Sequence, residues 1–269
     1  MAWVWGLIGS LVIAGAAYWR KSLSLSGLIS AVVLGTTMFA LGSLAWFGTL
    51  IAFFISSTLL SKFKHRRKAA VESGYAKGGR RDAGQVAANG GLGLLLCLGH
   101  AIWPDPVWWM LFVGVMATVN ADTWATEIGG LSKAAPRSIL NGRQVLAGTS
   151  GGVTGLGLLA SVLGGSFIGI IGGCFSQIGD RSLDLYELLT LVIVGALSGL
   201  LGSLADSWLG ATVQVMYRCQ ICGKTIEKKV HCDQQAIQIR GMRTVTNDRV
   251  NAISSLIGGL ACLGISLLL

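Results

Sequence analysis

The sequence is poor in charged residues, which make up 12% of its 269 positions, while 52% of the residues are hydrophobic. A soluble globular domain has about a quarter charged residues, so this class is excluded. The apolar residues come in runs of about 18 to 25, the length that crosses a bilayer as a helix. The composition therefore predicts a polytopic membrane protein.

Two common signals are also missing. The first apolar run, residues 2–19, has no basic segment before it and no small-residue cleavage site after it, so we interpret it as a retained span. The Gly-rich stretch GTSGGVTG at 148–155 is not completed by Gly-Lys-Ser or Gly-Lys-Thr, which excludes a Walker P-loop. Any nucleotide chemistry must therefore use other groups.

We predict an all-α polytopic membrane protein with about eight transmembrane helices in a single integral-membrane domain, residues 1–269. The predicted spans are 2–19, 23–42, 43–61, 83–103, 107–130, 147–173, 187–210 and 250–268. The sixth is longer than a bilayer requires and rich in Gly, so it is expected to be tilted or broken near its start.

The distribution of Lys and Arg predicts the orientation. Eight alternating spans put the loops at 20–22, 62–82, 131–146 and 211–249 on one side, and these hold 20 of the 21 Lys and Arg residues. Because such residues accumulate on the cytoplasmic side, both termini are expected on the non-cytoplasmic side. The basic loop at 62–82 and a Cys-rich loop at 215–249 would be cytoplasmic. The net charge of +9 then needs no nucleic-acid partner and leaves basic groups for phosphates and membrane lipid.

Glycines inside the predicted spans recur at four-residue intervals, as in 165/169/173 and 195/199. Small residues at this spacing let membrane helices approach closely. They predict tight packing within the bundle or at the contact of a homodimer.

Three carboxylates lie within the predicted spans: Asp122 and Glu127 in ADTWATEIG, and Asp206 in ADSW. A charge at this depth costs a few kcal/mol unless it is paired or hydrated. No Lys or Arg lies within the spans to pair with them. Mg²⁺ would suit their hard oxygens, with phosphate oxygens completing its shell. The alternative is that the carboxylates accept hydrogen bonds from Ser, Thr and Trp and fasten the helices together.

The polar groups of several spans are expected at one depth. Asp122 and Asp206 each lie ~12 Å from the cytoplasmic end of their spans, at 1.5 Å per residue. GTSGGVTG begins the sixth span, where free backbone N–H groups can bind an anion. Other polar residues near this level are Asn89, Thr149, Ser150 and Asn251, and nearby arginines are Arg80, Arg81, Arg137, Arg143, Arg240, Arg243 and Arg249. The sequence therefore predicts a metal and phosphate site at the cytoplasmic face.

A second group of candidate ligands lies in YRCQICGKTIEKKVHCD, residues 217–233. The CxxCG half-site and the later His-Cys pair are typical of a zinc knuckle with the ligands Cys219, Cys222, His231 and Cys232. A loop without metal and a redox pair remain the alternatives. The other cysteines, Cys97, Cys174 and Cys262, fall in spans and are interpreted as packing residues.

Six motifs together resemble one family. They are KSLSLSG (21–27), GRRDAGQVAANGG (79–91), NADTWATEIG (120–129), PRSILNGRQVLAGTSGGVTGLG (136–157), ADSWLGATVQ (205–214) and NDRVNAISSLIGG (247–259). The chain is similar, over nearly its whole length, to the integral-membrane family that contains transmembrane protein 19 and the phytyl-phosphate kinase of tocopherol synthesis.

This resemblance implies a kinase that uses CTP or another NTP to convert an isoprenyl monophosphate, such as phytyl phosphate, to the diphosphate. It would serve phytol salvage in the plasma or thylakoid membrane of a photosynthetic bacterium, with the active site facing the cytoplasm. In such an enzyme Asp122, Glu127 and Asp206 would hold Mg²⁺. The phosphates would be oriented by Asn89, Asn120 and Asn251, neutralised by Arg81, Arg137, Arg143 and Arg249, and contacted by Thr149 and Ser150.

Two other functions fit part of the pattern. A transporter or flippase of a lipid phosphate or small anion would use the polar layer as its translocation site, but it should place that layer near the midplane. A scaffold that recruits partners through its zinc loop would leave the intramembrane acids unexplained. The cytoplasmic displacement of the acids favours an enzyme.

Overall fold

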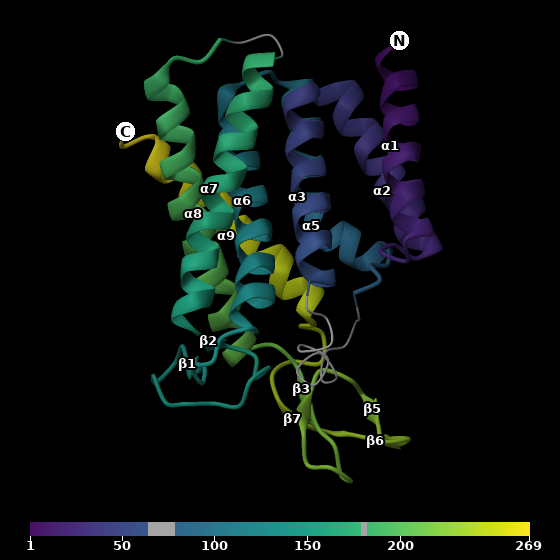
Figure 1. The fold of residues 1–269 in the computed structure, drawn as a ribbon, viewed down its shortest axis with the longest axis vertical. Helices are drawn as coiled ribbons and strands as arrows, with labels where there is room; N and C mark the ends of the chain where they lie inside the picture. Colours follow the sequence, from purple (N-terminus) through teal and green to yellow (C-terminus); the bar gives the residue numbers. More distant parts are fainter. Residues whose placement is uncertain (64–78, 179–181) are drawn as a thin grey trace.

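The structure is a computed structural model that describes residues 1–63, 79–178 and 182–269. Long helices form one bundle, and short strands gather at one end of it (Figure 1). The helices are α1 (Ala2–Trp19), α2 (Leu25–Thr37) continued by the π-helical turn η1 (Met38–Gly42), α3 (Leu44–Lys62), α5 (Ala83–Ile102), α6 (Pro106–Gly129), α7 (Gly155–Ile178), α8 (Leu185–Thr212) and α9 (Asn247–Ser266). The predicted all-α membrane fold is confirmed.

The short strands lie in the loops that connect α6 to α7 and α8 to α9. They are β1 (Arg137–Ser138), β2 (Gly152–Val153), β3 (Met216–Arg218), β4 (Thr225–Ile226), β5 (Val230–His231), β6 (Gln234–Gln235) and β7 (Ile237–Arg240). β1 pairs with β2, β5 pairs with β6, and the third sheet has the order β4-β3-β7, all antiparallel. Both chain ends point toward the opposite end of the bundle (Figure 1). Most of the predicted basic loop at 62–82 lies outside the described residues.

The sixth predicted span starts at residue 155 and not at 147, and its expected break near the start is found there. Residues 148–154 form a turn and the short strand β2, and α7 begins only at Gly155. The side chain of Thr154 accepts a hydrogen bond from the amide of Gly157 at 3.0 Å, which satisfies one of the free donors at the helix start. Gly151, at φ +83°, lies in a conformation that an α-helix cannot contain. GTSGGVTG is therefore a loop that leads into α7.

Seven of the helical segments in the described ranges are long and apolar enough to cross a membrane, and α6 is not among them. Its 24 residues are sufficient in length, but Asn120 and Asp122 lower its hydropathy. Every residue of α6 from Phe112 to Ala121 is buried, and the helix contacts α3, α5, α7, α8 and α9. α6 is thus the central helix and is shielded from lipid by its neighbours.

Close contact between α7 and α8 depends on the glycines that recur at four-residue intervals. A Cβ atom on Gly165 would lie 2.3 Å from the carbonyl oxygen of Gly195, and one on Gly169 would lie 2.3 Å from that of Leu191. These obstacles are backbone atoms, which cannot swing aside as a side chain can. The small residues are therefore used for packing within the chain.

Gly165→Ala is expected to destabilise the bundle by about 1–3 kcal/mol, the usual effect of overpacking. Gly15→Ala in α1 is the matched control, because a Cβ atom there meets nothing within 4 Å. Thermal unfolding of both variants in the same detergent measures the difference. Equal melting temperatures for the two variants would contradict the predicted clash.

Candidate functional site

A cavity of about 760 Å³ lies at the end of the bundle that carries the loops and strands. Its walls come from the first turns of α5, α7 and α9, the last turns of α6 and α8, and the loop between α6 and α7. Its ionisable lining residues are Asp122, Glu127, Asp206, Glu227 and Asp248 among the acids, and Arg81 and Lys133 among the bases. This excess of acid favours the binding of cations, or of anions that bring cations with them.

Asp122 and Asp206 reach the cavity from neighbouring helices. Asp122 is seven residues before the end of α6 and Asp206 is six before the end of α8, which places them ~10 Å and ~9 Å from those ends. Both carboxylates line the same cavity. The equal depth expected from the sequence is therefore found, with both groups in one cavity.

Asp206 belongs to a polar group that links α8 to α9 and α5. Ser254 donates from Oγ to Asp206 Oδ2 at 2.9 Å. With its amide nitrogen turned toward α8, Asn251 donates to the same oxygen at 3.1 Å, and its side chain also lies 3.4 Å from that of Asn89. These contacts hold one side of the carboxylate, while the residue lines the cavity.

Glu127 lies on a different part of the wall. α6 continues without a break to Gly129, so Glu127 is not brought round to Asp122. Ser61 of α3 donates from Oγ to Glu127 Oε1 at 2.5 Å. Glu127 also attracts the guanidinium of Arg81. The position of Glu127 between α3 and Arg81 suits a residue that orients a cationic group.

Arg81 is the basic group best placed to receive an anion. It lies just before α5, lines the cavity, donates from Nη1 to Thr58 at 2.9 Å and covers the ring of Phe54 at 5.6 Å from the ring centre. Burial lowers the pKa of its guanidinium to about 10, and Glu127 opposes that shift. The side chain therefore remains charged at neutral pH.

The loop at 148–154 forms another wall of the cavity. Thr149, Ser150 and Gly151 all line it. Ser150 donates from Oγ to Gln214 at 3.2 Å, and Gly151 packs so closely on α8 that a Cβ atom would lie 2.4 Å from the side chain of Ala211. The loop is thus fixed at the start of α7, next to Asp206 and Ser207, where an anion could reach its backbone.

Four predicted site residues do not line the cavity. Asn120 is fully buried; it donates to the carbonyl of Gly164 at 2.8 Å and accepts from Ser56 at 3.0 Å, so it joins α3, α6 and α7. Arg137 lies in β1 and donates to Gly142 at 2.9 Å. The remaining two are Arg143 and Arg249. The other members of the set all line the cavity, but Glu127 lies apart from Asp122 and Asp206 and does not join them as a metal ligand: Arg81, Asn89, Asp122, Glu127, Thr149, Ser150, Asp206 and Asn251.

Sequence reasoning missed several polar groups of the wall. They are Gln85, Lys133, Gln214, Glu227, Asn247 and Asp248. Asp248 could have been predicted as a site residue, because it lies beside Arg249 in the first turn of α9, within the motif NDRVNAISSLIGG. Glu227 carries no such signal, because it lies in the Cys-rich loop and reaches the cavity through a hydrogen bond from Gln214 at 2.9 Å.

The chemistry of this lining fits Mg²⁺, which prefers carboxylate oxygens and keeps several water or phosphate ligands. In the described ranges, the one group of three or more Cys, His, Asp and Glu side chains with donor atoms within 4.8 Å of each other is the cysteine cluster at 219–232. The carboxylates of the cavity are therefore spread out, and an ion there would take at most two of them.

A second, apolar cavity of about 50 Å³ lies between α1, α2, α3 and α5. Its walls are side chains such as Ile13, Leu34, Leu50 and Phe53. It shares Arg81, Gln85 and Asn89 with the acidic cavity. These three residues therefore stand between the polar cavity and a small apolar space, so that the Arg81 guanidinium has an apolar neighbour on one side.

Fold and site together define a polytopic integral membrane protein with an acid-rich cavity at one end of its bundle. The chain belongs to the family described as Integral membrane protein DUF92, whose model matches residues 8–259. This confirms the family expected from the sequence motifs.

Two relatives cover much of the chain. "Protein PGR" of Arabidopsis thaliana is 34% identical over 271 residues, which span 94% of this chain and 92% of that relative. "Uncharacterized membrane protein MJ0933" of Methanocaldococcus jannaschii is 30% identical over 193 residues, 71% of this chain and 74% of that protein. No solved structure matches the chain.

Proposed function

We propose that the protein is a phosphotransferase that converts an isoprenyl monophosphate, of which phytyl phosphate is the expected example, to the diphosphate with CTP or another NTP. The observation that carries this proposal is the acid-rich cavity, whose wall holds Arg81 beside a small apolar space among α1, α2, α3 and α5. The phosphate would meet Arg81, and the prenyl chain would extend from there along α1, α2, α3 and α5 into the lipid, because the apolar space of about 50 Å³ holds only its first carbons. The nucleotide would occupy the larger, acid-rich cavity.

The reaction requires mainly positioning and neutralisation of charge. An oxygen of the lipid phosphate attacks the γ-phosphorus, a new P–O bond forms, and the bond to the β-phosphate oxygen breaks to release the nucleoside diphosphate. The attacking group is already an anion, so it needs no strong general base. Mg²⁺ bound by Asp122, Asp206 and phosphate oxygens would supply charge neutralisation. Arg81 would hold the acceptor phosphate, while Thr149, Ser150 and the loop amides would bind the donor.

The shape of the bundle supports an enzyme better than a carrier. Beyond the acidic cavity, α6 is surrounded by apolar side chains such as Phe112, Met116 and Ile168, which form one core cluster. A transport path would need polar groups through this region. Placing the cavity on the cytoplasmic side, as the distribution of basic residues predicts, would give it access to nucleotides.

The test uses purified protein in detergent with phytyl or geranylgeranyl phosphate, Mg²⁺ and CTP, ATP or GTP labelled at the γ-phosphate. We expect labelled lipid diphosphate that requires both Mg²⁺ and the lipid phosphate. A folded protein that yields no diphosphate with any of the three nucleotides would refute the proposal. Movement of labelled lipid phosphate across vesicles without nucleotide would instead establish a flippase.

A further inference from the structure

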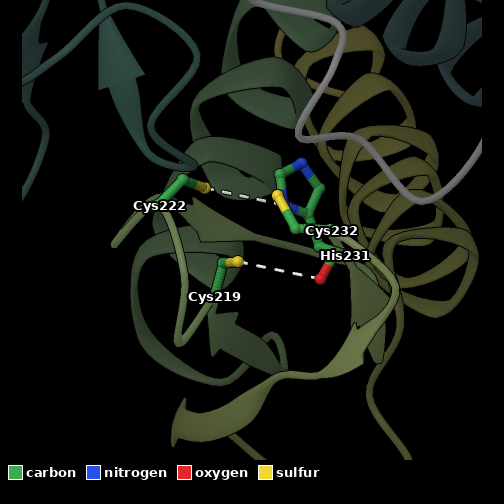
Figure 2. Close-up of side chains that lie close together, drawn as sticks. All are labelled: Cys219, Cys222, His231 and Cys232. Carbon is green, nitrogen blue, oxygen red and sulfur yellow. Dashed lines mark hydrogen bonds between the residues drawn. The ribbon is translucent and has the colours of Figure 1, made fainter.

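The segment between α8 and α9 contains a group of ligand atoms that the proposed reaction does not use. The Sγ atoms of Cys219, Cys222 and Cys232 and a ring nitrogen of His231 all lie within 4.8 Å of one another. Figure 2 shows the thiols and the imidazole grouped between the CxxC turn and the β5–β6 hairpin. These four residues, here called the Cys₃His cluster, come from two separate turns of the chain.

The first half of the cluster is a tight turn that brings Cys219 and Cys222 together. Gly223 donates to the carbonyl of Cys219 at 3.0 Å, the amide of Cys219 donates to that of Lys224 at 3.0 Å, and Gly223 takes φ +69°. The turn therefore presents two thiols from one short stretch of chain, and a metal binds them as thiolates.

The second half places a cysteine where that residue type is rarely found. β5 and β6 are joined by Cys232 and Asp233, with φ angles of +51° and +57°. A two-residue turn with both φ angles positive favours Asn and Gly, and other residues there carry strain. Cys232 nevertheless occupies it, with Sγ 3.1 Å from His231 Nδ1, and Cys222 Sγ lies 3.6 Å from the same nitrogen. The strained turn thus brings a third sulfur to the imidazole.

The segment has very little core of its own. Its buried cluster consists of Val215, Tyr217, Cys219 and Ile226. So few apolar side chains cannot stabilise a fold of this size, and small folds of this kind need a metal or disulfides. One of the four buried residues is itself a member of the Cys₃His cluster.

We propose that the Cys₃His cluster binds one structural Zn²⁺ through Cys219, Cys222, His231 and Cys232. Three sulfurs and one imidazole nitrogen are a closed tetrahedral ligand set for zinc, and no position is left for substrate. Neighbouring sulfurs in such a tetrahedron are about 3.8 Å apart, so the present spacing needs only small side-chain movements. Soft thiolates exclude Mg²⁺, which distinguishes this site from the acidic cavity.

The zinc site would support the wall of the acidic cavity. In the sequence, Glu227 lies between the two halves of the cluster. Its side chain accepts a hydrogen bond from Gln214 Nε2 at 2.9 Å and lines the cavity. Farther along, Arg240 donates to the carbonyl of Gly210 at 2.8 Å, and a Cβ atom on Gly241 would lie 2.0 Å from the carbonyl oxygen of Gln214. The three-stranded sheet is therefore docked directly on the end of α8. Zinc would hold the sheet together and keep Glu227 in place.

Metal analysis of the purified full chain tests the proposal. We expect about one zinc per chain in the wild type and a large loss in Cys222→Ser. Cys174→Ser is the matched control, because Cys174 is an exposed cysteine of α7 outside the cluster, and it should retain all the zinc. Wild-type protein without stoichiometric zinc, or equal zinc in the two variants, would overturn the assignment. Stoichiometric iron in place of zinc would overturn it as well.

If the Cys222→Ser variant fails to fold, a second measurement on wild-type protein tests the proposal. Wild-type protein is stripped with a chelator and then given Co²⁺ or Zn²⁺ alone. Co²⁺ should produce the absorption bands of tetrahedral thiolate coordination, and Zn²⁺ should restore protection of residues 217–240 against protease. Absence of these bands would overturn the proposal, as would mass-spectrometric detection of a Cys219–Cys222 disulfide in protein purified under reducing conditions.

Discussion

Asp206→Asn should lower the rate of diphosphate formation at least about 100-fold, because removing one group that stabilises charge in a transition state costs about 10²–10³ in rate. Asn keeps the size of the side chain and can still accept the hydrogen bond from Ser254. It lacks the charge that attracts Mg²⁺. The fold should survive, since removing a carboxylate from a low-dielectric site also removes its desolvation cost. Initial rates with labelled nucleotide, together with the melting temperature, measure both effects.

The control for this substitution is Asp105→Asn at the other end of the bundle. Asp105 caps the start of α6, where its side chain accepts from the amide of Val107 at 2.8 Å, and Asn is equally good in this position. Both substitutions replace an Asp by an Asn, but Asp105 is not part of the cavity wall. Asp206→Asn with the rate of Asp105→Asn would show that Asp206 only fastens α8 to α9. Raising Mg²⁺ should recover part of the lost rate in Asp206→Asn if the carboxylate binds the ion.

Arg81→Gln is expected to raise the KM for the lipid phosphate about 10- to 100-fold, because a hydrogen bond to a charged group contributes about 1.5–3 kcal/mol. The guanidinium meets the acceptor phosphate in both the ground state and the transition state, so kcat should change less than KM. Arg81→Lys should have a KM between those of the wild type and Arg81→Gln, since Lys keeps the charge but lacks the planar guanidinium that binds phosphate with two hydrogen bonds. Steady-state kinetics with varied lipid phosphate at saturating nucleotide separates the two parameters.

The neighbouring arginine supplies the control. Arg80 donates from Nε to the carbonyl of Leu23 at 3.0 Å and covers the ring of Tyr18, and it does not line the cavity. Arg80→Gln should leave the KM for the lipid close to that of the wild type. If both substitutions raise it equally, Arg81 attracts the lipid only through general surface charge.

Much of the site could be predicted from sequence, because carboxylates within apolar runs are costly and therefore informative. Asp122 and Asp206 were found by that argument, and Arg81 and Asn89 by their position at the start of a span. Asn120 shares a helical face with Glu127, but it lies two turns deeper, where Ser56 of α3 and Gly164 of α7 enclose it. A shared face does not imply a shared environment on a helix that is surrounded on all sides.

The limits of the sequence are clearest in the loops. Hydropathy does not specify the path of residues 130–154, so it could not show that Arg137, predicted beside Ser150 in the site, forms a strand away from the cavity wall. The same holds for Glu227, whose place depends on a hydrogen bond from Gln214, a residue just after α8. Zinc-ligand spacing, by contrast, is a local pattern, and the structure brings its four residues together as the spacing predicts.

The enclosure of α6 has a consequence for how the chain enters the membrane. A segment with this hydropathy gains little from lipid alone, and its partners α7, α8 and α9 are synthesised after it. We therefore expect α6 to insert stably only after α7, α8 and α9 have entered the membrane and packed around it. Ser254 and Asn251, which hold Asp206, lie on α9, the last of them. Biogenesis would thus complete the acidic cavity only when the final helix is in the bilayer, and a ribosome-bound chain would remain inactive until then.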